Sequence, residues 1–239
     1  MGGPFAGGAI LVGQSIGGGY RFGKDQWENG MAAKHDGHLG AVYAASKPEE
    51  IAGVYDAWAE SYDAEMAVAG YRHPSIGLAL LARHLPRGAG PLLDAGVGTG
   101  LIGPWLGIIG YGPVEGLDIS AGMLAVAARK GAYAALHHLA LGGVLPFADG
   151  AYAGIISTGV FTTGHVGAEA LAELVRVCRP GGVLVLTVKD TVWQGGFAAE
   201  VARLVAAGRI AVAEETAPYV SMPGEVGTVP SRAVVLRVL

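Results

Sequence analysis

Residues 92–103 read LLDAGVGTGLIG, and this stretch decides the fold. A short apolar run passes through Asp94 into a glycine-rich turn and then into a helical pattern, which is typical of the first strand, loop and helix of a parallel α/β sheet. Its last six residues, GTGLIG, match the G-x-G-x-x-G spacing of dinucleotide-binding loops. The loop therefore predicts an adenosine ligand, either a dinucleotide or a different adenosine compound.

Asp94, two residues before Gly96, distinguishes between these two candidate ligands. Its carboxylate would lie near the two phosphate charges of a dinucleotide, and like charges about 4 Å apart repel by roughly 4 kcal/mol at an effective dielectric constant of about 20. A ligand with an ammonium and a sulfonium group has the opposite preference. Asp118, which ends the next apolar run, suits the ribose hydroxyls of either ligand. A nicotinamide-dependent dehydrogenase is therefore the least favoured function.

The composition indicates one globular domain without a nucleic-acid or membrane partner. The 239 residues are 51% hydrophobic and 15% charged, and 16 Lys and Arg against 20 Asp and Glu leave a net charge of −4 without a basic stripe. No stretch reaches the roughly 18 apolar residues of a membrane span, and the N-terminal residues lack the basic region of a secretory signal. The single cysteine, Cys178, cannot form an internal disulfide. We expect a cytoplasmic protein.

Glycine density divides the chain. Residues 1–45 carry a large share of the 41 glycines, which raises the entropic cost of ordering a helix or strand. We predict an N-terminal arm here, either a tail or a flap over an active site. Residues 46–239 then form the folded domain, with a helical lid over 46–86 and a core over 87–239.

Helices are predicted at the start of this domain. Ser46 and Glu49 fit a capping box, apolar residues recur at helical spacing after them, and Gly70 can end the helix. A second helix, over about 75–85, is closed by Pro86.

From there, short apolar runs alternate with helical stretches, as in stacked βαβ units. The expected strands are residues 91–96, 113–118, 135–139, 152–158 and 183–188, and the expected helices are 100–109, 120–130, 167–177 and 195–207. The tail adds two β-rich runs, RIAVAEETAPYV and SRAVVLRVL, without a helix between them. The prediction is an α/β fold with a Rossmann-like, seven-stranded, mostly parallel sheet, a C-terminal antiparallel hairpin strand and helices on both faces.

The motifs together resemble the class I S-adenosylmethionine-dependent methyltransferases. DAGVGTG, residues 94–100, is similar to their motif I, Asp118 stands at their ribose position, and VRVCRPGGVLVLT resembles their turn into the fifth strand. Within that superfamily, VYDAWAESYDAEM, GYRHP and LDISAGMLAVAARKGAY are similar to the methyltransferase-like proteins of the Williams–Beuren syndrome region. The resemblance covers about residues 46–190.

The resemblance implies S-adenosylmethionine as cofactor and methyl transfer to an O, N or S atom of a small molecule, without a bound metal. The alternative is a regulatory or scaffold protein that binds the cofactor on the same fold without transferring methyl. The cofactor contacts that it implies come from Tyr62, Asp94, Ala95, Gly96, Gly98, Gly100, Asp118, Ile119 and Met123.

The sequence departs from the family in two places. Leu141 stands about where many members bind the adenine amine with an acidic residue, and Ala153 stands where they often have an Asp in the fourth strand. We therefore expect adenine to be held by backbone groups and apolar packing. The motif of the amino-group nucleic-acid methyltransferases is absent after that strand, where GVFTTGHV stands instead.

Aromatic residues can hold a sulfonium through cation–π attraction. Tyr55, Trp58 and Tyr62 share one face of the first helix. For Tyr62 both cofactor contact and core packing stay open, whereas Tyr55 and Trp58 are expected to pack in the core or lid, because aromatic stripes at helical spacing are usually buried.

His165 is the candidate general base, because it follows the fourth strand at the edge where open α/β sheets bind ligands. The alternative is a loop histidine without a catalytic part. His137 and His138 are adjacent in a strand and point to opposite faces, so they are interpreted as structural. His35 and His38 could contact a metal ion, but two ligands in a glycine-rich arm favour a solvated loop instead.

Overall fold

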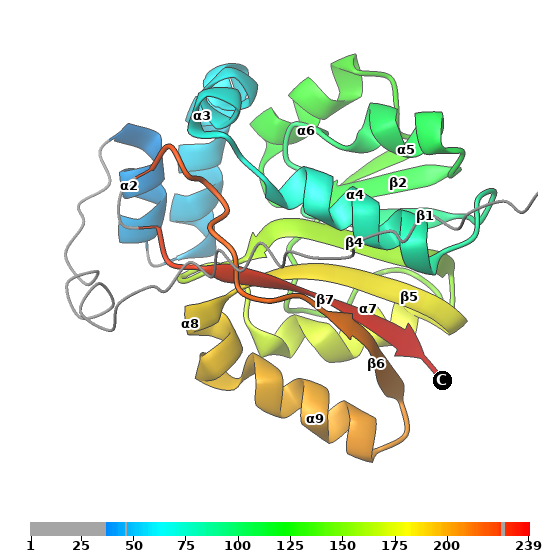
Figure 1. Ribbon diagram of the computed structural model, residues 1–239. Coiled ribbons are helices and arrows are strands. Elements are labelled where there is room, and N and C mark those ends of the chain that lie inside the picture. The colour runs from blue at the N-terminus through cyan, green and yellow to red at the C-terminus, as the bar shows by residue number, and fades with distance from the viewer. Residues whose placement is uncertain (1–36, 46, 226–227) are drawn as a thin grey trace, which may run out of the picture. The chain divides into compact units, whose positions relative to one another are not determined.

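The computed structural model describes residues 37–45, 47–225 and 228–239. Its strands form one seven-stranded sheet with the order β3-β2-β1-β4-β5-β7-β6 (Figure 1). The strands are β1 Leu92–Ala95, β2 Val114–Asp118, β3 Ala135–His138, β4 Tyr152–Phe161, β5 Cys178–Lys189, β6 Ile210–Glu215 and β7 Ser231–Val238.

Pairing in the sheet is parallel except at β7. Strand β1 pairs in parallel with β2 and with β4, so the carboxyl ends of these three strands meet at one edge. Strand β7 runs antiparallel to both of its neighbours, β5 and β6. The predicted mostly parallel sheet with a C-terminal antiparallel hairpin strand is therefore confirmed. The strand order changes direction at β1, which is the position where open α/β sheets bind ligands.

Helices cover both faces of this sheet (Figure 1). Helices α4, α5 and α6 lie on one face, and α7 and α9 lie on the other. The helical segments are α2 Gly37–Ala44, α3 Pro48–Ala69, α4 His73–His84, α5 Gly103–Ile109, α6 Ala121–Arg129, η2 Ala168–Ala170, α7 Leu171–Val177, α8 Asp190–Val192, η3 Trp193–Phe197 and α9 Ala198–Ala206.

Two apolar clusters sandwich the sheet. Leu184 of β5 and Leu236 of β7 pack with α7 and α9, whereas Val185 and Val235, the neighbouring residues, pack with α4 and α5. All four side chains are fully buried. Strands that are buried on both faces carry continuous apolar sequences rather than alternating ones, which explains the runs VLVLTV and AVVL.

Several element boundaries differ from the expected ones. Helix α3 starts at Pro48 with Lys47 as its N-cap, whereas Ser46 of the predicted capping box lies outside the described residues. Gly70 ends this helix in the left-handed conformation, with φ of 67°, as expected. The last predicted helix is preceded by two more helical segments, α8 and η3, with a kink at Gly196 where φ is 129°.

The predicted arm and lid are described in part. Residues 1–36 of the arm lie outside the described residues, and residues 37–44 form α2, where no element was expected. Within the predicted lid, α4 packs into the core against β4 and β5 through Leu80 and Leu81, so it belongs to the sheet layer.

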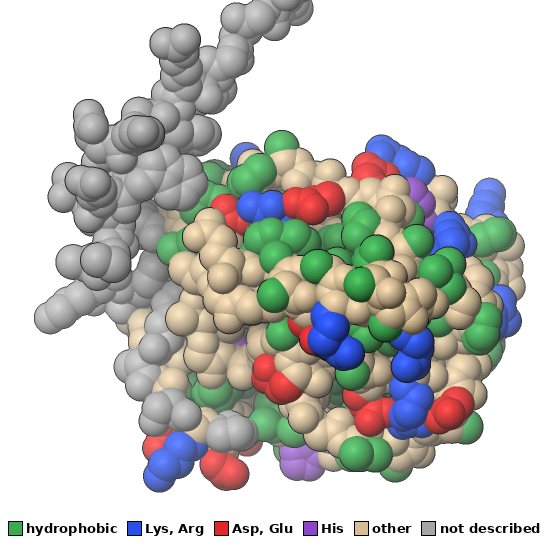
Figure 2. Space-filling model, turned by 90° about the horizontal axis from the view of Figure 1, so that it is seen from below, with side chains coloured by type: hydrophobic (Ala, Val, Ile, Leu, Met, Phe, Trp, Pro, Cys, Tyr) green, Lys and Arg blue, Asp and Glu red, His purple; other side chains and the backbone are tan. Residues whose placement is uncertain are grey.

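Charged side chains of both signs are interspersed on the face that carries α7 and α9. Figure 2 shows this face, where blue and red groups alternate with apolar ones. Ion pairs account for part of the pattern, such as Arg203 with Glu200 at 2.7 Å and Arg176 with Asp149 at 2.6 Å. In the described part of the chain, no helix combines the length and apolar character needed to cross a membrane.

Candidate active site

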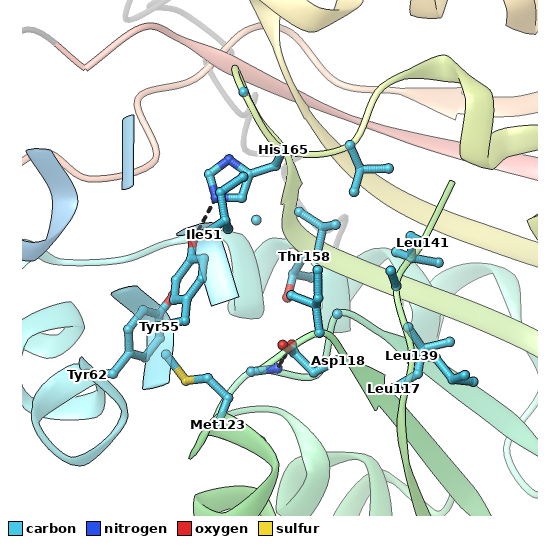
Figure 3. Close-up of a pocket in the computed structure, with 18 residues that line it drawn as sticks. Ile51, Tyr55, Tyr62, Leu117, Asp118, Met123, Leu139, Leu141, Thr158 and His165 are labelled. Carbon is cyan, nitrogen blue, oxygen red and sulfur yellow. Dashed lines mark hydrogen bonds between the residues drawn. The ribbon is translucent and has the colours of Figure 1, made fainter. Parts of the chain in front are cut away.

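A cavity of about 240 Å³ lies at the carboxyl edge of β1, β2 and β4. Its lining comes from α3, the loop after β1, the end of β2, the start of α6, the loop after β3 and the end of β4 with the loop that follows it. Figure 3 shows Tyr55 and Tyr62 on one side, Leu139 and Leu141 on the opposite side, and Asp118 near the floor. We call this space the main cavity.

The loop after β1 needs glycine at two positions because of its backbone conformation. Gly96 has φ of 81°, and a Cβ atom there would lie 2.1 Å from Cγ2 of Val160. Gly98 has φ of 53° and open space around it. L-residues rarely adopt this left-handed conformation. The loop backbone is therefore exposed to the main cavity, where a ligand can approach it closely.

Asp118 ends β2 and lines the main cavity. Its carboxylate accepts hydrogen bonds from the backbone N–H of Gly98 at 2.8 Å and of Ser120 at 2.9 Å. Burial raises its pKa above the usual value, and these backbone hydrogen bonds act in the opposite direction. Each carboxylate oxygen can still accept a further hydrogen bond, so this group can bind two neighbouring hydroxyls.

Asp94 is buried behind the same loop, with 2% of its surface exposed. It accepts a hydrogen bond of 2.7 Å from the hydroxyl of Tyr133. Burial and, to a lesser extent, the charge of Asp118 raise its pKa to about 7, although the hydrogen bond from Tyr133 acts in the opposite direction. Asp94 lines a small cavity of about 30 Å³ that shares Gly96 and Gly98 with the main cavity. A cationic group of a ligand at this loop would favour the ionised carboxylate.

The other end of the main cavity is apolar. Leu139, Ala140 and Leu141, after β3, line it together with Met123 of α6. Leu141 thus presents an apolar side chain to the main cavity, and its contact with adenine stays a prediction. Ala153, the second departure from the family pattern, is fully buried with the α4 and α5 cluster and does not line the described cavities.

Helix α3 supplies the aromatic wall. Tyr62 and Tyr55 both line the main cavity, whereas Trp58 is 2% exposed and packs in a cluster with Met66 and Met222. The expectation of core packing is confirmed for Trp58. Tyr55 packs against the same cluster while it lines the main cavity, and its hydroxyl reaches His165 in the loop after β4. The helical spacing placed the three rings on one face but did not show how deep each would lie.

Two aspartates of α3 contact residues at the two ends of α6. The carboxylate of Asp56 accepts hydrogen bonds from the hydroxyl of Ser120 at 2.6 Å and from the N–H of Gly122 at 2.8 Å. Asp63 pairs with Lys130 at 2.6 Å. Asp56 therefore satisfies a backbone N–H at the start of α6 that has no partner inside that helix. These contacts hold the aromatic wall over the cavity.

His165 lies in the loop after β4 and lines the main cavity. Its Nε2 is 3.1 Å from the hydroxyl of Tyr55, and its Nδ1 is 2.9 Å from Oγ1 of Thr162 and 3.3 Å from the carbonyl oxygen of Thr163. A carbonyl only accepts, so the contact with Thr163 favours a proton on Nδ1 and leaves the lone pair on Nε2. Burial lowers the pKa of His165, which keeps the imidazole neutral near pH 7. The arrangement presents a neutral base to the cavity.

Residues 93–186 match the family model described as a methyltransferase domain. This segment contains the glycine loop, Asp118 and His165. It is a class I methyltransferase domain. The predicted family resemblance is therefore confirmed, and the class depends on S-adenosylmethionine.

Three known proteins are similar to this chain. The chain is 36% identical over 141 residues to human methyltransferase-like protein 27, covering 56% of each chain, which confirms the resemblance to the Williams–Beuren proteins. It is 35% identical over 141 residues to the malonyl-[acyl-carrier protein] O-methyltransferase of Serratia marcescens, covering 58% of this chain and 52% of that one. The chain spans about half the length of these curated relatives. A TehB-like S-adenosylmethionine-dependent methyltransferase from Corynebacterium glutamicum shares the fold, with a TM-score of 0.59, 21% identity and coverage of 78% of this chain and 99% of that one.

A second, smaller cavity of about 40 Å³ adjoins the main cavity of the methyltransferase domain. Both cavities are lined by Tyr55, Tyr62, Gly159 and His165, so these residues form their common wall. Lys189, at the end of β5, lines the smaller cavity and is 6% exposed. The sequence analysis did not identify Lys189 as a cavity residue. Its position at the carboxyl end of a strand, directly after six apolar or small residues, is a signal that could have indicated it.

The predicted site residues divide into three groups, of which Asp94, in the small cavity behind the loop after β1, is one. Tyr62, Gly96, Gly98, Asp118, Ile119, Met123 and His165 line the main cavity. Ala95 and Gly100 lie outside the lining of the described cavities, and Gly100 packs against Tyr133 and Ala127, where a Cβ atom would lie 2.9 Å from the tyrosine ring. Contact of all these residues with a cofactor stays a prediction.

The remaining histidines have other partners. Nε2 of His137 is 2.8 Å from Glu115, and Nε2 of His138 is 2.8 Å from the carbonyl oxygen of Ile119. The ring of His38 stacks on Trp58 at 5.5 Å, and His35 lies outside the described residues. Within the described part of the chain, no group of three or more His, Cys, Asp or Glu side chains is arranged to hold a metal ion.

Proposed function

We propose that the protein transfers a methyl group from S-adenosylmethionine to an O, N or S atom of a small molecule. One observation carries the proposal: the main cavity is lined by a buried carboxylate, a glycine loop, an aromatic wall and a neutral histidine. The class I methyltransferase domain over residues 93–186 supports the choice of cofactor.

The lining residues fit this cofactor. Asp118 would accept hydrogen bonds from the two ribose hydroxyls, and Leu139 and Leu141 would pack on the adenine. Asp94, behind Gly96, would attract the ammonium group of the methionine part through the glycine loop. Tyr62 would present its ring to the sulfonium, an interaction worth about 0.5 to 2 kcal/mol depending on desolvation.

The cofactor supplies a methyl group on a positively charged sulfur, and its transfer is an in-line displacement. The protein needs no covalent nucleophile for such a step. It aligns the acceptor with the methyl carbon and excludes water from an apolar pocket. The half-buried aromatic wall on α3 performs this exclusion. His165 would remove the proton of an acceptor hydroxyl, thiol or ammonium through Nε2, the atom that now accepts from Tyr55.

A small molecule is the acceptor that the geometry favours. The second cavity is lined in part by α2, α3 and the ends of β4 and β5, and its volume suits a few atoms rather than a polymer chain. The Serratia relative is an O-methyltransferase of malonyl-[acyl-carrier protein], which supports an oxygen atom as one of the acceptor types to test.

Calorimetry with S-adenosylhomocysteine and NAD tests the cofactor assignment. We expect S-adenosylhomocysteine to bind more tightly, because Asp94 repels phosphate and attracts ammonium. Tighter binding of NAD would overturn the assignment. Incubation with S-adenosylmethionine labelled in its methyl group and a metabolite extract tests catalysis. Binding of S-adenosylhomocysteine without transfer to any metabolite would favour the alternative, a regulatory protein that binds the cofactor.

A further inference from the structure

The last glycine of the G-x-G-x-x-G spacing, Gly103, has a role that the turn itself does not explain. It starts α5 and does not share the positive φ of Gly96, Gly98 and Gly100. It also lies outside the lining of the described cavities. A Cβ atom at Gly103 would lie 2.6 Å from Cε2 of Tyr133, and one at Gly100 would lie 2.9 Å from the same atom. These two glycines therefore make room for the Tyr133 ring.

Tyr133 reaches the loop from the segment between α6 and β3. The backbone N–H of the next residue, Ala134, donates a hydrogen bond of 2.7 Å to the carbonyl oxygen of Val114, which ties this segment to β2. The half-buried ring packs with Val97 of the loop and Leu124 of α6. Its position is thus fixed by the protein before a ligand binds.

The hydroxyl of Tyr133 is directed at Asp94. It donates a hydrogen bond of 2.7 Å to Oδ2 of Asp94 and accepts one from the backbone of Gly103. The second contact orients the hydroxyl, so its proton lies toward the carboxylate. A hydrogen bond to the charged form of an acid favours that form. Burial has the largest effect on the pKa of Asp94 and raises it, whereas the bond from Tyr133 lowers it.

The other groups around Asp94 give this hydrogen bond its importance. Asp118, at the end of β2, adds a second negative charge that raises the pKa of Asp94. Tyr62 and Tyr71 line the same small cavity, and burial raises the pKa of Tyr71 well above its usual value. The described residues that line this cavity include no Lys, Arg or His. The hydroxyl of Tyr133 therefore stabilises a negative charge on Asp94 that a cationic ligand can use.

We propose that Tyr133 is a positioning residue of the cofactor site: its hydroxyl orients the Asp94 carboxylate and favours its ionised form, which attracts the ammonium group of S-adenosylmethionine. This inference rests on the proposed function. A carboxylate can accept at both oxygens, so the bond to Oδ2 leaves acceptor capacity for the ligand. The last glycine of the loop then accommodates a tyrosine, and its presence does not require a pyrophosphate.

Tyr133→Phe tests the proposal, because it keeps the ring and removes only the hydroxyl. Calorimetry measures the affinity for S-adenosylhomocysteine, which carries the same ammonium group, at constant ionic strength between about pH 5.5 and 8.5. In the wild-type protein the affinity should rise with pH as Asp94 ionises. In Tyr133→Phe this rise should move to a pH higher by roughly one unit, the scale of a hydrogen bond to a charged group, and binding near pH 7 should be several-fold weaker.

Tyr152→Phe is the matched control. The Tyr152 hydroxyl also donates to a carboxylate, that of Glu115, at 3.0 Å, and neither residue lines the described cavities. Its pH profile should coincide with that of the wild-type protein. Asp94→Asn removes the titrating group and should abolish the rise near pH 7. Adding Tyr133→Phe to Asp94→Asn should change the pH profile no further, because the two residues act as a pair.

A Tyr133→Phe profile that matches the wild-type profile, or that is lowered equally at every pH, would contradict the proposal, since the hydroxyl would then not act through Asp94. A rise near pH 7 that is unchanged in Asp94→Asn would also contradict it, even if Tyr133→Phe does not fold. Titration of Asp118, His165 and the ligand is common to the wild-type protein and Tyr133→Phe, so it does not displace one profile from the other. Failure of the wild-type protein to bind S-adenosylhomocysteine at any pH contradicts the proposed function instead.

Discussion

Asp118 holds the loop after β1 and the start of α6 through one side chain. It accepts backbone hydrogen bonds from both segments while lining the main cavity, so its carboxylate is fixed before a ligand meets it. We expect Asp118→Ala to weaken binding of S-adenosylhomocysteine by about 1 to 3 kcal/mol, the scale of hydrogen bonds to a charged group. Calorimetry measures this loss. Asp149→Asn, at an exposed aspartate outside the cavities, is the control, and an unchanged dissociation constant in Asp118→Ala would remove Asp118 from the ribose site.

Substitution of His165 tests its role in catalysis separately from any role in cofactor binding. His165→Ala should lower turnover by roughly 10²- to 10⁴-fold and leave the affinity for S-adenosylhomocysteine nearly unchanged. Because burial lowers the pKa of His165 below its ordinary value, turnover should fall on acidification at a lower pH than it would for an exposed histidine base, as the base becomes protonated. Single-turnover methyl transfer, measured from neutral to acidic pH, follows both effects.

His84→Ala is the matched control for this histidine, because His84 pairs with Glu214 at 2.6 Å outside the cavities. If His165→Ala keeps wild-type turnover, His165 is a loop residue without a catalytic role. Alignment of the acceptor with the methyl carbon and exclusion of water then account for the reaction.

Asp94 links the stability of the fold to pH. Its pKa in the folded protein is about 7, against 3.8 in an unfolded chain, so the folded state holds the proton more tightly. The contribution of Asp94 to the free energy of unfolding is therefore highest below pH 4 and is lost as the pH rises through 7, by roughly 4 kcal/mol at most. Asp94→Asn keeps an acceptor for Tyr133 and should remove this loss.

Urea unfolding at pH 5 and pH 8 measures the effect. The wild-type protein should lose more of its free energy of unfolding between these values than Asp94→Asn does, with Asp149→Asn as the control. The same pH dependence in the wild-type protein and Asp94→Asn would show that the buried carboxyl is ionised at both values.

Helix α3 depends on its contacts with α6 for its position. Asp56 makes two hydrogen bonds to the start of α6, whereas Glu60 forms an exposed pair with Arg129 at 2.8 Å. A side chain that caps a helix start contributes typically about 1 kcal/mol, and exposed ion pairs contribute less. We expect Asp56→Ala to speed amide hydrogen exchange along residues 48–69 and to weaken S-adenosylhomocysteine binding, because Tyr62 loses its fixed position.

Glu60→Ala is the comparison, since it removes a carboxylate from the same helix and should leave both measurements nearly unchanged. Equal exchange in Asp56→Ala and the wild-type protein would mean that apolar packing alone positions α3.

At the scale of the whole molecule, β7 joins the two layers of the core. Leu236 is fully buried among α7, α9 and the sheet, whereas Leu239 at the end of the chain is 61% exposed. Leu236→Ala should lower the free energy of unfolding by about 2 to 5 kcal/mol, through lost burial and the cavity left behind. Leu239→Ala should change it by less than about 0.5 kcal/mol. Urea unfolding of both variants checks this, and equal midpoints would indicate that the C-terminal strand does not contribute to the cooperative core.

The sequence by itself determined the sheet and the loop after β1. Continuous apolar runs separated by helical stretches predict strands that are buried on both faces, and these are properties of neighbouring residues. The glycine loop is equally local, since Gly96 and Gly98 supply the backbone conformations that the turn needs. Asp118 was found because its distance along the chain from the loop follows from the length of one strand and one helix.

Only the tertiary structure decided which residues surround His165. The contact between Tyr55 and His165 joins residues 110 positions apart, and Asp56 reaches Ser120 across 64 positions. Lys189 lines the second, smaller cavity because β5 pairs with β4 and ends beside it, and α3 and Met222 form other walls of that cavity. Such contacts depend on how α3 packs across the sheet edge. Local periodicity specifies which face of a helix is apolar, but the partner of that face is set by the packing of the whole domain.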